Sequence, residues 1–267
     1  EVARSRDRNR ALREIAVLLA RDGQVLRAFA LLDAINDPID LMPALFDLLW
    51  SPDSDDYVFV VPTGAKERSA ALKAVQRVVA LSRSLDDPER RGQAMFEASS
   101  LYLEFGEIDA ATALMDQSEG DGWQPLWLNK RVHKLVETGD FAEAERLAEA
   151  IAESDPEWIW SYWTLAEGLA AAGQPAEARR VLGRLANPSS RLLVQTQVAV
   201  DLADIDPKAS ARFLAEAEAL TAGIADPDDR VQALGWVGAA FAEIGDSDTA
   251  QAVAARLITV GAAADAT

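Results

Sequence analysis

Apolar residues recur along most of this chain at spacings of three and four, the pattern of helices with one buried face. Six times an apolar stretch ends at a glycine or aspartate, and an alanine follows five residues later. The pairs are Gly23/Ala28, Gly106/Ala111, Gly139/Ala144, Gly173/Ala178, Asp206/Ala211 and Gly245/Ala250. Consecutive intervals from Gly106 to Asp206 are 33, 34 and 33 residues, which indicates a repeat array.

Each repeat has the composition of two packed helices. A small or modest residue stands seven positions before the glycine or aspartate, and a large apolar residue stands four before it, as Ala166 and Leu169 do before Gly173. A small residue on the first helix lets the second helix approach its backbone, and the large residue fills the groove between successive pairs. We therefore predict an all-α stack of helix pairs.

The periodicity predicts seven such pairs, with glycine ending most first helices and Asp-Pro steps opening several of the next units. First helices are expected near 8–21, 39–50, 89–104, 124–137, 157–171, 190–203 and 228–243. Second helices are expected near 25–35, 65–84, 108–117, 141–153, 175–186, 207–223 and 247–260. The predicted organisation is a basic lead-in at 1–7, a repeat domain at 8–260 and a frayed tail at 261–267.

The second pair is interrupted by residues 51–64, which contain the only stretch of β-type composition, around Tyr57 and Phe59. Two interpretations remain open for this long loop or short extended flap. It is either a surface excursion packed on its own repeat, or a candidate binding loop whose apolar strip contacts a partner.

Residues 126–188 resemble two successive tetratricopeptide (TPR) repeats. The resemblance rests on the run from Gly139 to Ala144, on Pro156, and on Tyr162, Leu165, Ala166, Leu169, Gly173, Ala178 and Leu182. It extends more loosely from Arg8 to Leu257. It implies a right-handed α-solenoid of about seven antiparallel helix pairs whose concave groove binds a peptide, loop or helix of another protein.

In TPR-like arrays first helices line the groove through residues thirteen, ten, six and three before the repeat glycine. Carried over to this chain, the resemblance implies as groove residues Phe96, Ser100, Asn129, His133, Trp160, Trp163, Glu167, Thr196 and Gln232. Trp160 and Trp163 share one side of a helix and are candidate anchors, because exposed tryptophans bury much area in recognition. The alternative is that they pack on a neighbouring repeat, whereas Tyr162 is expected in the interior.

Asn129 also matches the residue type with which some TPR clamps grip a carboxylate. Trp163 and Thr196 stand where such a clamp needs further polar or basic partners, so a full clamp is not expected. A separate similarity, over residues 226–250, is to degenerate repeats appended to large bacterial signalling NTPases. It provides an alternative function, the sensor or autoinhibitory arm of a signalling ATPase, with further domains of the same polypeptide as partners.

The net charge of −18, from 44 acidic and 26 basic residues, disfavours nucleic acid and anionic membranes as partners. Cysteine is absent and His133 is the only histidine, so no disulfide, thiolate metal site or histidine cluster is expected. No cofactor is predicted. No apolar run reaches the ~20 residues of a membrane span, and no secretory signal is visible, which favours a cytoplasmic location.

The motifs of common enzyme classes are missing from the sequence. It has no phosphate-binding loop and no Gly-x-Ser-x-Gly elbow, and one histidine without cysteine leaves little room for a nucleophile and base. The alternative from another class is an α-toroid enzyme that uses paired carboxylates. We predict no catalytic residues and a protein–protein interaction scaffold.

Overall fold

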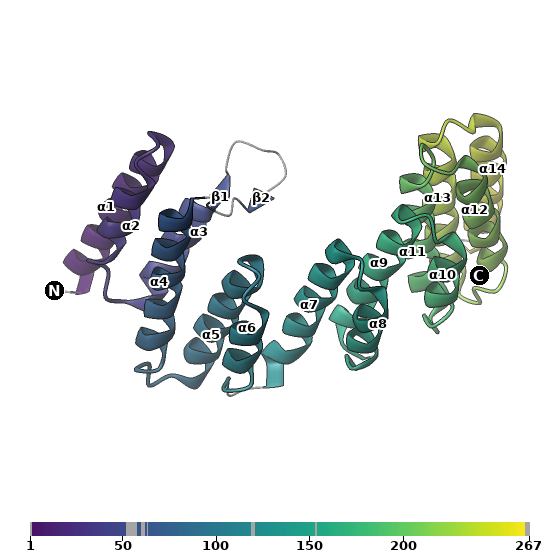
Figure 1. Ribbon diagram of the computed structural model, residues 1–267. Helices are drawn as coiled ribbons and strands as arrows, with labels where there is room; N and C mark the ends of the chain where they lie inside the picture. The colour runs from purple at the N-terminus through teal and green to yellow at the C-terminus, as the bar shows by residue number, and fades with distance from the viewer. Residues whose placement is uncertain are drawn as a thin grey trace. The chain divides into compact units, whose positions relative to one another are not determined.

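The computed structural model describes residues 2–51, 58–59, 62, 64–118, 121–152 and 154–264. In this part of the chain fourteen helices follow one another as seven antiparallel pairs (Figure 1), so the predicted all-α repeat fold is confirmed. The first helices are α1 (Val2–Arg21), α3 (Pro38–Leu49), α5 (Pro88–Glu104), α7 (Gln124–Thr138), α9 (Pro156–Ala171), α11 (Pro188–Asp201) and α13 (Pro227–Glu243). The second helices are α2 (Val25–Leu32), α4 (Ala65–Ser82), α6 (Ile108–Met115), α8 (Phe141–Glu149), α10 (Pro175–Leu182), α12 (Pro207–Thr221) and α14 (Ser247–Ala264).

The two outermost helices are longer than expected. Helix α1 begins at Val2, inside the segment taken as a basic lead-in, and α14 continues to Ala264, inside the segment taken as a frayed tail. A 3-10 turn, η1 (Asp121–Trp123), precedes α7. Part of the interruption in the second pair forms two antiparallel strands, β1 (Trp50–Ser51) and β2 (Val58–Phe59), with Trp50 opposite Phe59.

In five of the pairs the first helix ends at a glycine in the left-handed region. At α9, Gly173 has a φ of +74°, its N–H donates to Ala170 O at 2.9 Å, and the N–H of Gln174 donates to Leu169 O at 2.8 Å. These two bonds satisfy carbonyls that the helix end would otherwise leave unpaired. A residue with a Cβ adopts this conformation only at a cost of about 1–2 kcal/mol. The other four glycines are Gly23, Gly106, Gly139 and Gly245.

The sixth pair differs at Asp206. Its φ is −139°, and its carboxylate caps α12 by accepting the N–H of Ala209 at 3.0 Å. Asp206 is thus the N-cap residue of α12, the position that Gln174 holds before α10, and it does not correspond to the glycine of the other pairs. Ser210, with 1% exposure, takes the interior position and donates to Ala199 O, whereas Ala211 is exposed. The predicted pair Asp206/Ala211 is therefore wrong by one residue.

Arginines close several of the turns that lead from one pair to the next. Arg230 donates from Nε and Nη2 to the carbonyl of Ile224, at 2.8 and 2.5 Å. Asp226 between them caps α13, with Pro227 in its first turn. The same six-residue spacing recurs in Arg191 to Leu185 O and Arg91 to Leu85 O.

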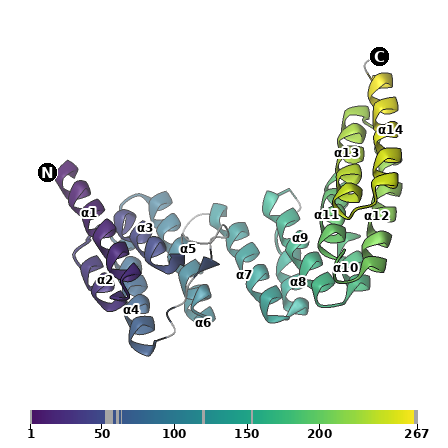
Figure 2. The ribbon, with the colours of Figure 1, turned by 90° about the horizontal axis from the view of Figure 1, so that it is seen from above.

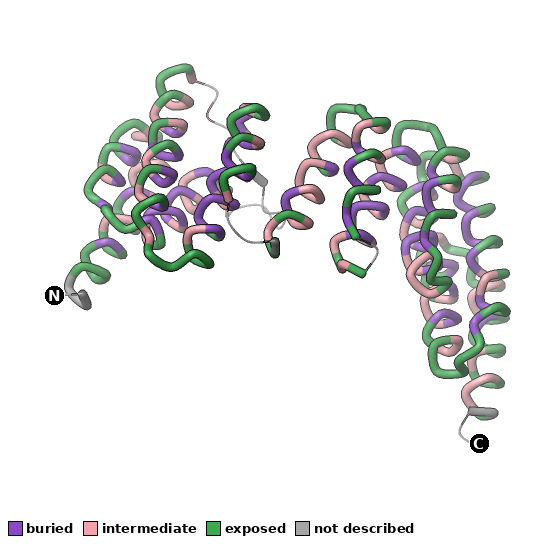
Figure 3. The backbone as a smooth tube through the Cα atoms, turned by 90° about the horizontal axis from the view of Figure 1, so that it is seen from below, coloured by how far each residue is buried: buried purple, intermediate pink, exposed green. Residues whose placement is uncertain are grey.

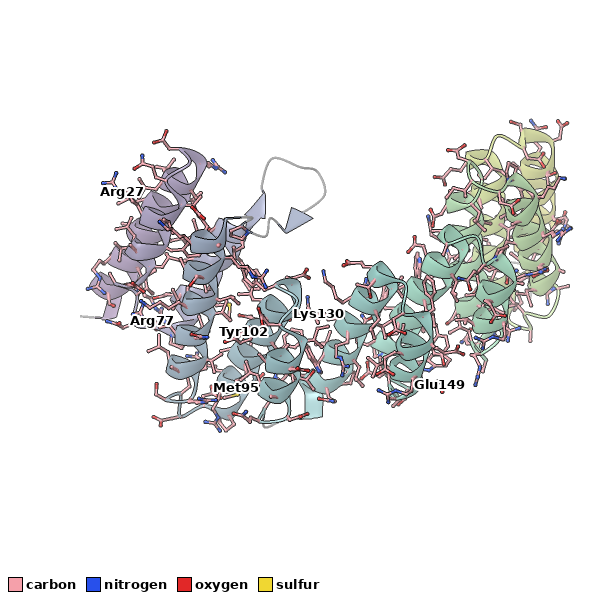
Figure 4. All side chains as sticks on the ribbon, in the orientation of Figure 1. Arg27, Arg77, Met95, Tyr102, Lys130 and Glu149 are labelled. Carbon is pink, nitrogen blue, oxygen red and sulfur yellow. The ribbon has the colours of Figure 1, made fainter. Side chains whose placement is uncertain are left out.

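Residues Glu1–Trp127 form one compact unit with its own core. In it, Met95 and Tyr102 of α5 are buried, and both are labelled in Figure 4. Arg77 of α4 donates to Leu32 O at 2.8 Å and to Asn36 Oδ1 at 2.7 Å, which ties α4 to the turn after α2.

Residues Leu128–Thr267 form the second compact unit, so the division falls within α7. Its core runs from Val132 to Val253, and helices α11 to α14 pack side by side in it (Figure 2). Buried and exposed positions alternate along each helix, as expected when one side faces neighbouring helices (Figure 3). Most of the predicted groove residues lie in this unit.

Candidate functional site

Helix α9 carries the largest exposed apolar side chain described in the second unit, that of Trp160. Asp155 caps its N-terminus by accepting the N–H of Glu157 at 2.9 Å, and Pro156 occupies its first position. One side of the helix is in the core, including Tyr162 at 2% exposure, which contacts Trp158 at a ring distance of 5.1 Å. The expected interior role of Tyr162 therefore agrees with its burial.

The opposite side of α9 presents a stripe of residues spaced by three and four, which places them in one row. In this row Trp160 and Trp163 stack with ring centroids 5.2 Å apart and an interplanar angle of 18°. Trp163 is partly buried against the core, whereas Trp160 is 51% exposed. The sequence left open whether these tryptophans are exposed anchors or pack on a neighbouring repeat. Trp163 packs inward, whereas Trp160 remains accessible.

Helix α7 lies beside the start of this stripe and holds it in place. The Asn129 amide donates to Glu157, and its carbonyl oxygen accepts the Ser161 hydroxyl at 3.0 Å. His133 Nε2 lies 2.8 Å from Thr164 Oγ1, within hydrogen-bonding distance. Asn129 is therefore engaged within the protein and positions α9.

A pair of carboxyl groups stands at the other end of the stripe. Glu167 of α9 forms a hydrogen bond with Asp201, the last residue of α11. Burial, this hydrogen bond and repulsion by Asp201 raise the pKa of Glu167 to about 7. Asp201 also accepts the Gln197 amide at 3.1 Å. Among the described residues, no cation pairs with either carboxylate.

Three residues predicted to line a groove are buried, with exposures of 5–8%. Phe96 stacks on Trp123 with ring centroids 5.2 Å apart, and the Ser100 hydroxyl donates to Phe96 O. Thr196 is short and lies on α11, which α9 and α13 flank, and its hydroxyl donates to Leu193 O. These side chains are not accessible to a partner.

The remaining predicted residues are exposed or lie elsewhere. His133 and Gln232 are exposed on α7 and α13. Phe59 belongs to β2, and the binding-loop prediction for Tyr57 lies outside the described residues. The residues that the repeat register missed are Asp201 and the two hydroxyl partners on α9. For Asp201 the sequence did hold a signal, because an acidic residue at a helix C-terminus is electrostatically unfavourable and often has a specific reason.

Other chemistry has little support among the described residues. No group of three or more His, Cys, Asp or Glu side chains there is arranged to hold a metal ion. A hollow of about 190 Å³ lies between α10 and α12, and Arg179 at its edge pairs with Glu216 at 2.9 Å. None of the described helices is long and apolar enough to cross a membrane.

Helix pairs that repeat this glycine-ended turn define a helical repeat protein. Residues 135–189, which include α8, α9 and α10, match the sequence model of the tetratricopeptide repeat. This segment is thus similar to a TPR repeat, and the described residues as a whole form an all-α helical repeat fold. TPR repeats generally mediate protein–protein interactions.

Solved structures that match the chain include TPR-like repeats, described as nearly identical to one another, from a Podosopora anserina protein provisionally assigned as a kinesin light chain. That match has 16% identity and a TM-score of 0.28, and it covers 98% of this chain and 99% of the other. A variant of the same repeats with one residue replaced matches with 17% identity and a TM-score of 0.27, covering 98% of both chains. No curated protein matches the sequence.

Proposed function

We propose that this chain is a protein-interaction module in which the α9 surface, formed by Trp160, Trp163 and Glu167, binds a segment of a partner protein. The observation that carries the proposal is the half-exposed Trp160 ring, held in one orientation by its stack on Trp163. A large ring that is already ordered loses little conformational entropy on binding. The partner is either a separate protein or a further domain of the same polypeptide.

The free energy available at this surface is consistent with specific recognition. Tryptophan anchors in interfaces commonly contribute about 2 kcal/mol or more, measured by truncation to alanine, which corresponds to about 30-fold in affinity. Because Trp163 packs on the core, its truncation would also destabilise the fold. Trp160 is therefore the better residue to test.

The test compares two truncations of exposed apolar residues in the second unit. The Trp160→Ala variant and the matched control Ile258→Ala, at an exposed α14 residue, are used as baits in a lysate of the source organism. Proteins captured by the wild-type chain are identified by mass spectrometry and their affinities measured with purified material. We expect Trp160→Ala to lose at least about 30-fold in affinity and Ile258→Ala to bind as the wild type does. Equal binding by both variants, with unchanged helicity, would reject the surface.

A further inference from the structure

The charges around the tryptophans suggest which kind of segment they bind. Resting on the proposed function, we infer that the α9 surface binds an extended basic segment of its partner, with one arginine or lysine side chain against Trp160 and a second next to the Glu167–Asp201 pair. Three observations support this, namely the carboxylates at both ends of the surface, the exposed ring of Trp160, and the distance between Glu157 and Glu167 along α9.

Carboxylates flank the tryptophan pair at both ends. Glu157 lies one turn before Trp160, and Glu167 lies one turn after Trp163, in the same row of α9. The partners of Glu157 and Asp201 are neutral amides, from Asn129 and Gln197. Both ends of the surface therefore carry carboxyl groups that these amide partners do not neutralise, within a chain of net charge −18.

Among the groups that shift the pKa of Glu167 there is no cation. Its pKa is raised to about 7 by burial first, and then by its hydrogen bond to Asp201 and repulsion from that group. A cation placed between the two carboxyl groups would favour the charged form of both. A cation bound there would therefore lower the pKa of Glu167 and release a proton near neutral pH.

Charged groups on the helices around α9 and α11 have described partners other than Glu167 and Asp201. Their described contacts are Arg180 to Glu145, Arg179 to Glu216, Lys134 to Glu137, Arg184 to Glu149, Arg191 to Leu185 O, and the hydrogen bond between His133 and Thr164. Glu149 and Arg184 act on Tyr162, which lies on the buried side of α9. Asp201 is the one charged group that shifts the pKa of Glu167. A cation from a partner would therefore not have to displace a basic side chain of this protein from Glu167.

The exposed tryptophan adds a second reason to expect a cation. Indole rings attract guanidinium and ammonium groups more strongly than other aromatic rings do, by about 0.5–2 kcal/mol. Trp160 is the exposed member of its stack and lies between the two acidic ends. An apolar segment would leave the carboxylates desolvated without a partner, and an acidic segment would be repelled.

The spacing of the acidic ends sets the length of the segment. Glu157 and Glu167 are ten residues apart on α9, or about 15 Å along the axis. An extended chain covers this distance in four or five residues at about 3.3 Å each. Two basic residues four or five positions apart would therefore reach both ends, the first lying against Trp160 near Glu157 and the second near Glu167.

The experiment uses short fluorescein-labelled Gly/Ser peptides and the full chain, with fluorescence anisotropy at low salt. One peptide carries two arginines four or five positions apart, a second has citrulline in their place, and a third has glutamate. We expect the arginine peptide to bind at pH 8, and the citrulline and glutamate peptides to bind at least about tenfold more weakly. Similar binding of the arginine and citrulline peptides, or no binding of either, would overturn the inference.

Variants that remove single carboxylates test where on the protein the arginine peptide binds. Glu167→Gln and Asp201→Asn should each weaken the arginine peptide about tenfold at pH 8, whereas Glu243→Gln, which removes an exposed carboxylate at the end of α13, should not. Because the wild type must lose the Glu167 proton, its affinity should fall about tenfold from pH 8 to pH 6. Glu167→Gln should lose this dependence, and His133→Asn should keep it. Equal effects of Glu167→Gln and Glu243→Gln would overturn the inference.

The inference and the proposed function can fail separately. If Trp160→Ala abolishes capture of the native partner but Glu167→Gln and Asp201→Asn leave it unchanged, the interaction surface stands and the basic segment is rejected. If the arginine peptide binds through Glu167 while Trp160→Ala leaves capture of the native partner unchanged, the cation site stands and the proposed function falls.

Discussion

Val136 of α7 occupies the space that a side chain on Gly168 of α9 would need. A Cβ built on Gly168 would lie 2.1 Å from Cγ1 of Val136, far inside contact distance. The absence of a side chain at this position lets α7 and α9 pack closely. The contacts of Asn129 and His133 with α9 depend on the same close approach.

We predict that Gly168→Ala destabilises the second unit by roughly 1–3 kcal/mol, because the added methyl forces stiff Val136 to move. Urea unfolding followed by circular dichroism measures the change. Adding Val136→Ala should recover part of the loss, since it removes the atoms that clash.

The matched control is Gly235→Ala, also within a helix, where an added Cβ would meet Leu257 Cδ1 at an ordinary 3.8 Å. There, replacing glycine by alanine in a helix should stabilise the protein by up to about 1 kcal/mol. If Gly168→Ala behaves in the same way as this control, the close approach of α7 and α9 is not as described.

A second prediction concerns the arginine that closes the turn before α11. Arg191 donates to Leu185 O through Nε and Nη2, at 2.9 and 2.7 Å. Truncation to alanine leaves that carbonyl without its charged donor, at a cost of about 1–2 kcal/mol. Arg191→Lys should recover less than half of it, because an ammonium cannot reproduce the planar two-nitrogen geometry.

Arg212→Ala is the control for Arg191, since Arg212 is exposed on α12 and its removal should change stability by less than about 0.5 kcal/mol. The comparison is made by urea unfolding of both variants. A cost of Arg191→Ala no larger than that of Arg212→Ala would mean that this turn is held by its Asn-Pro step alone.

A third prediction tests the register of the sixth pair. Ala211 is exposed, whereas Ala178, at 0% exposure, occupies the interior position of the fifth pair. Ala211→Lys should therefore change the free energy of unfolding by less than about 0.5 kcal/mol, whereas Ala178→Lys should cost several kcal/mol by burying a charge. Similar costs for the two variants would restore the register predicted from the sequence.

The register of the repeats shows which features of the fold can be predicted from the sequence pattern and which cannot. The pairs ended by Gly139 and Gly173 were placed correctly, because spacing and a glycine with positive φ are both properties of local sequence. Asp206 was treated as an equivalent of those glycines, since its role as a helix cap is visible only from its bond to Ala209. The one-residue shift of the interior position from Ala211 to Ser210 left no mark in the apolar spacing.

The site was less predictable than the fold because accessibility depends on neighbours distant in sequence. The repeat register placed Phe96 and Trp163 at the same offset, yet Trp123 covers Phe96 and Trp163 supports the exposed Trp160. The Glu167–Asp201 contact joins two different repeats. No offset within a single repeat could have predicted it.

The last prediction follows from the raised pKa of Glu167, about 7 against an ordinary 4.5. Between these values the folded chain holds a proton that the unfolded chain has lost, so stability is highest on the acid side of this window and falls as pH rises through about 7. The loss should be of the order of 1 kcal/mol, because Glu167 is only partly buried and solvent screens the pair. Melting temperatures from pH 5 to pH 8 measure it.

In Asp201→Asn the repulsion is gone and the amide donates to Glu167, so its pKa should return toward the ordinary range and the slope between pH 5 and pH 8 should flatten. Glu243→Gln should keep the wild-type slope. Staying above pH 5 matters, because Arg180 holds the pKa of Glu145 below its ordinary value, and that contribution is lost only at lower pH. Parallel profiles for the wild type and Asp201→Asn would show that the carboxyl pair does not share a proton.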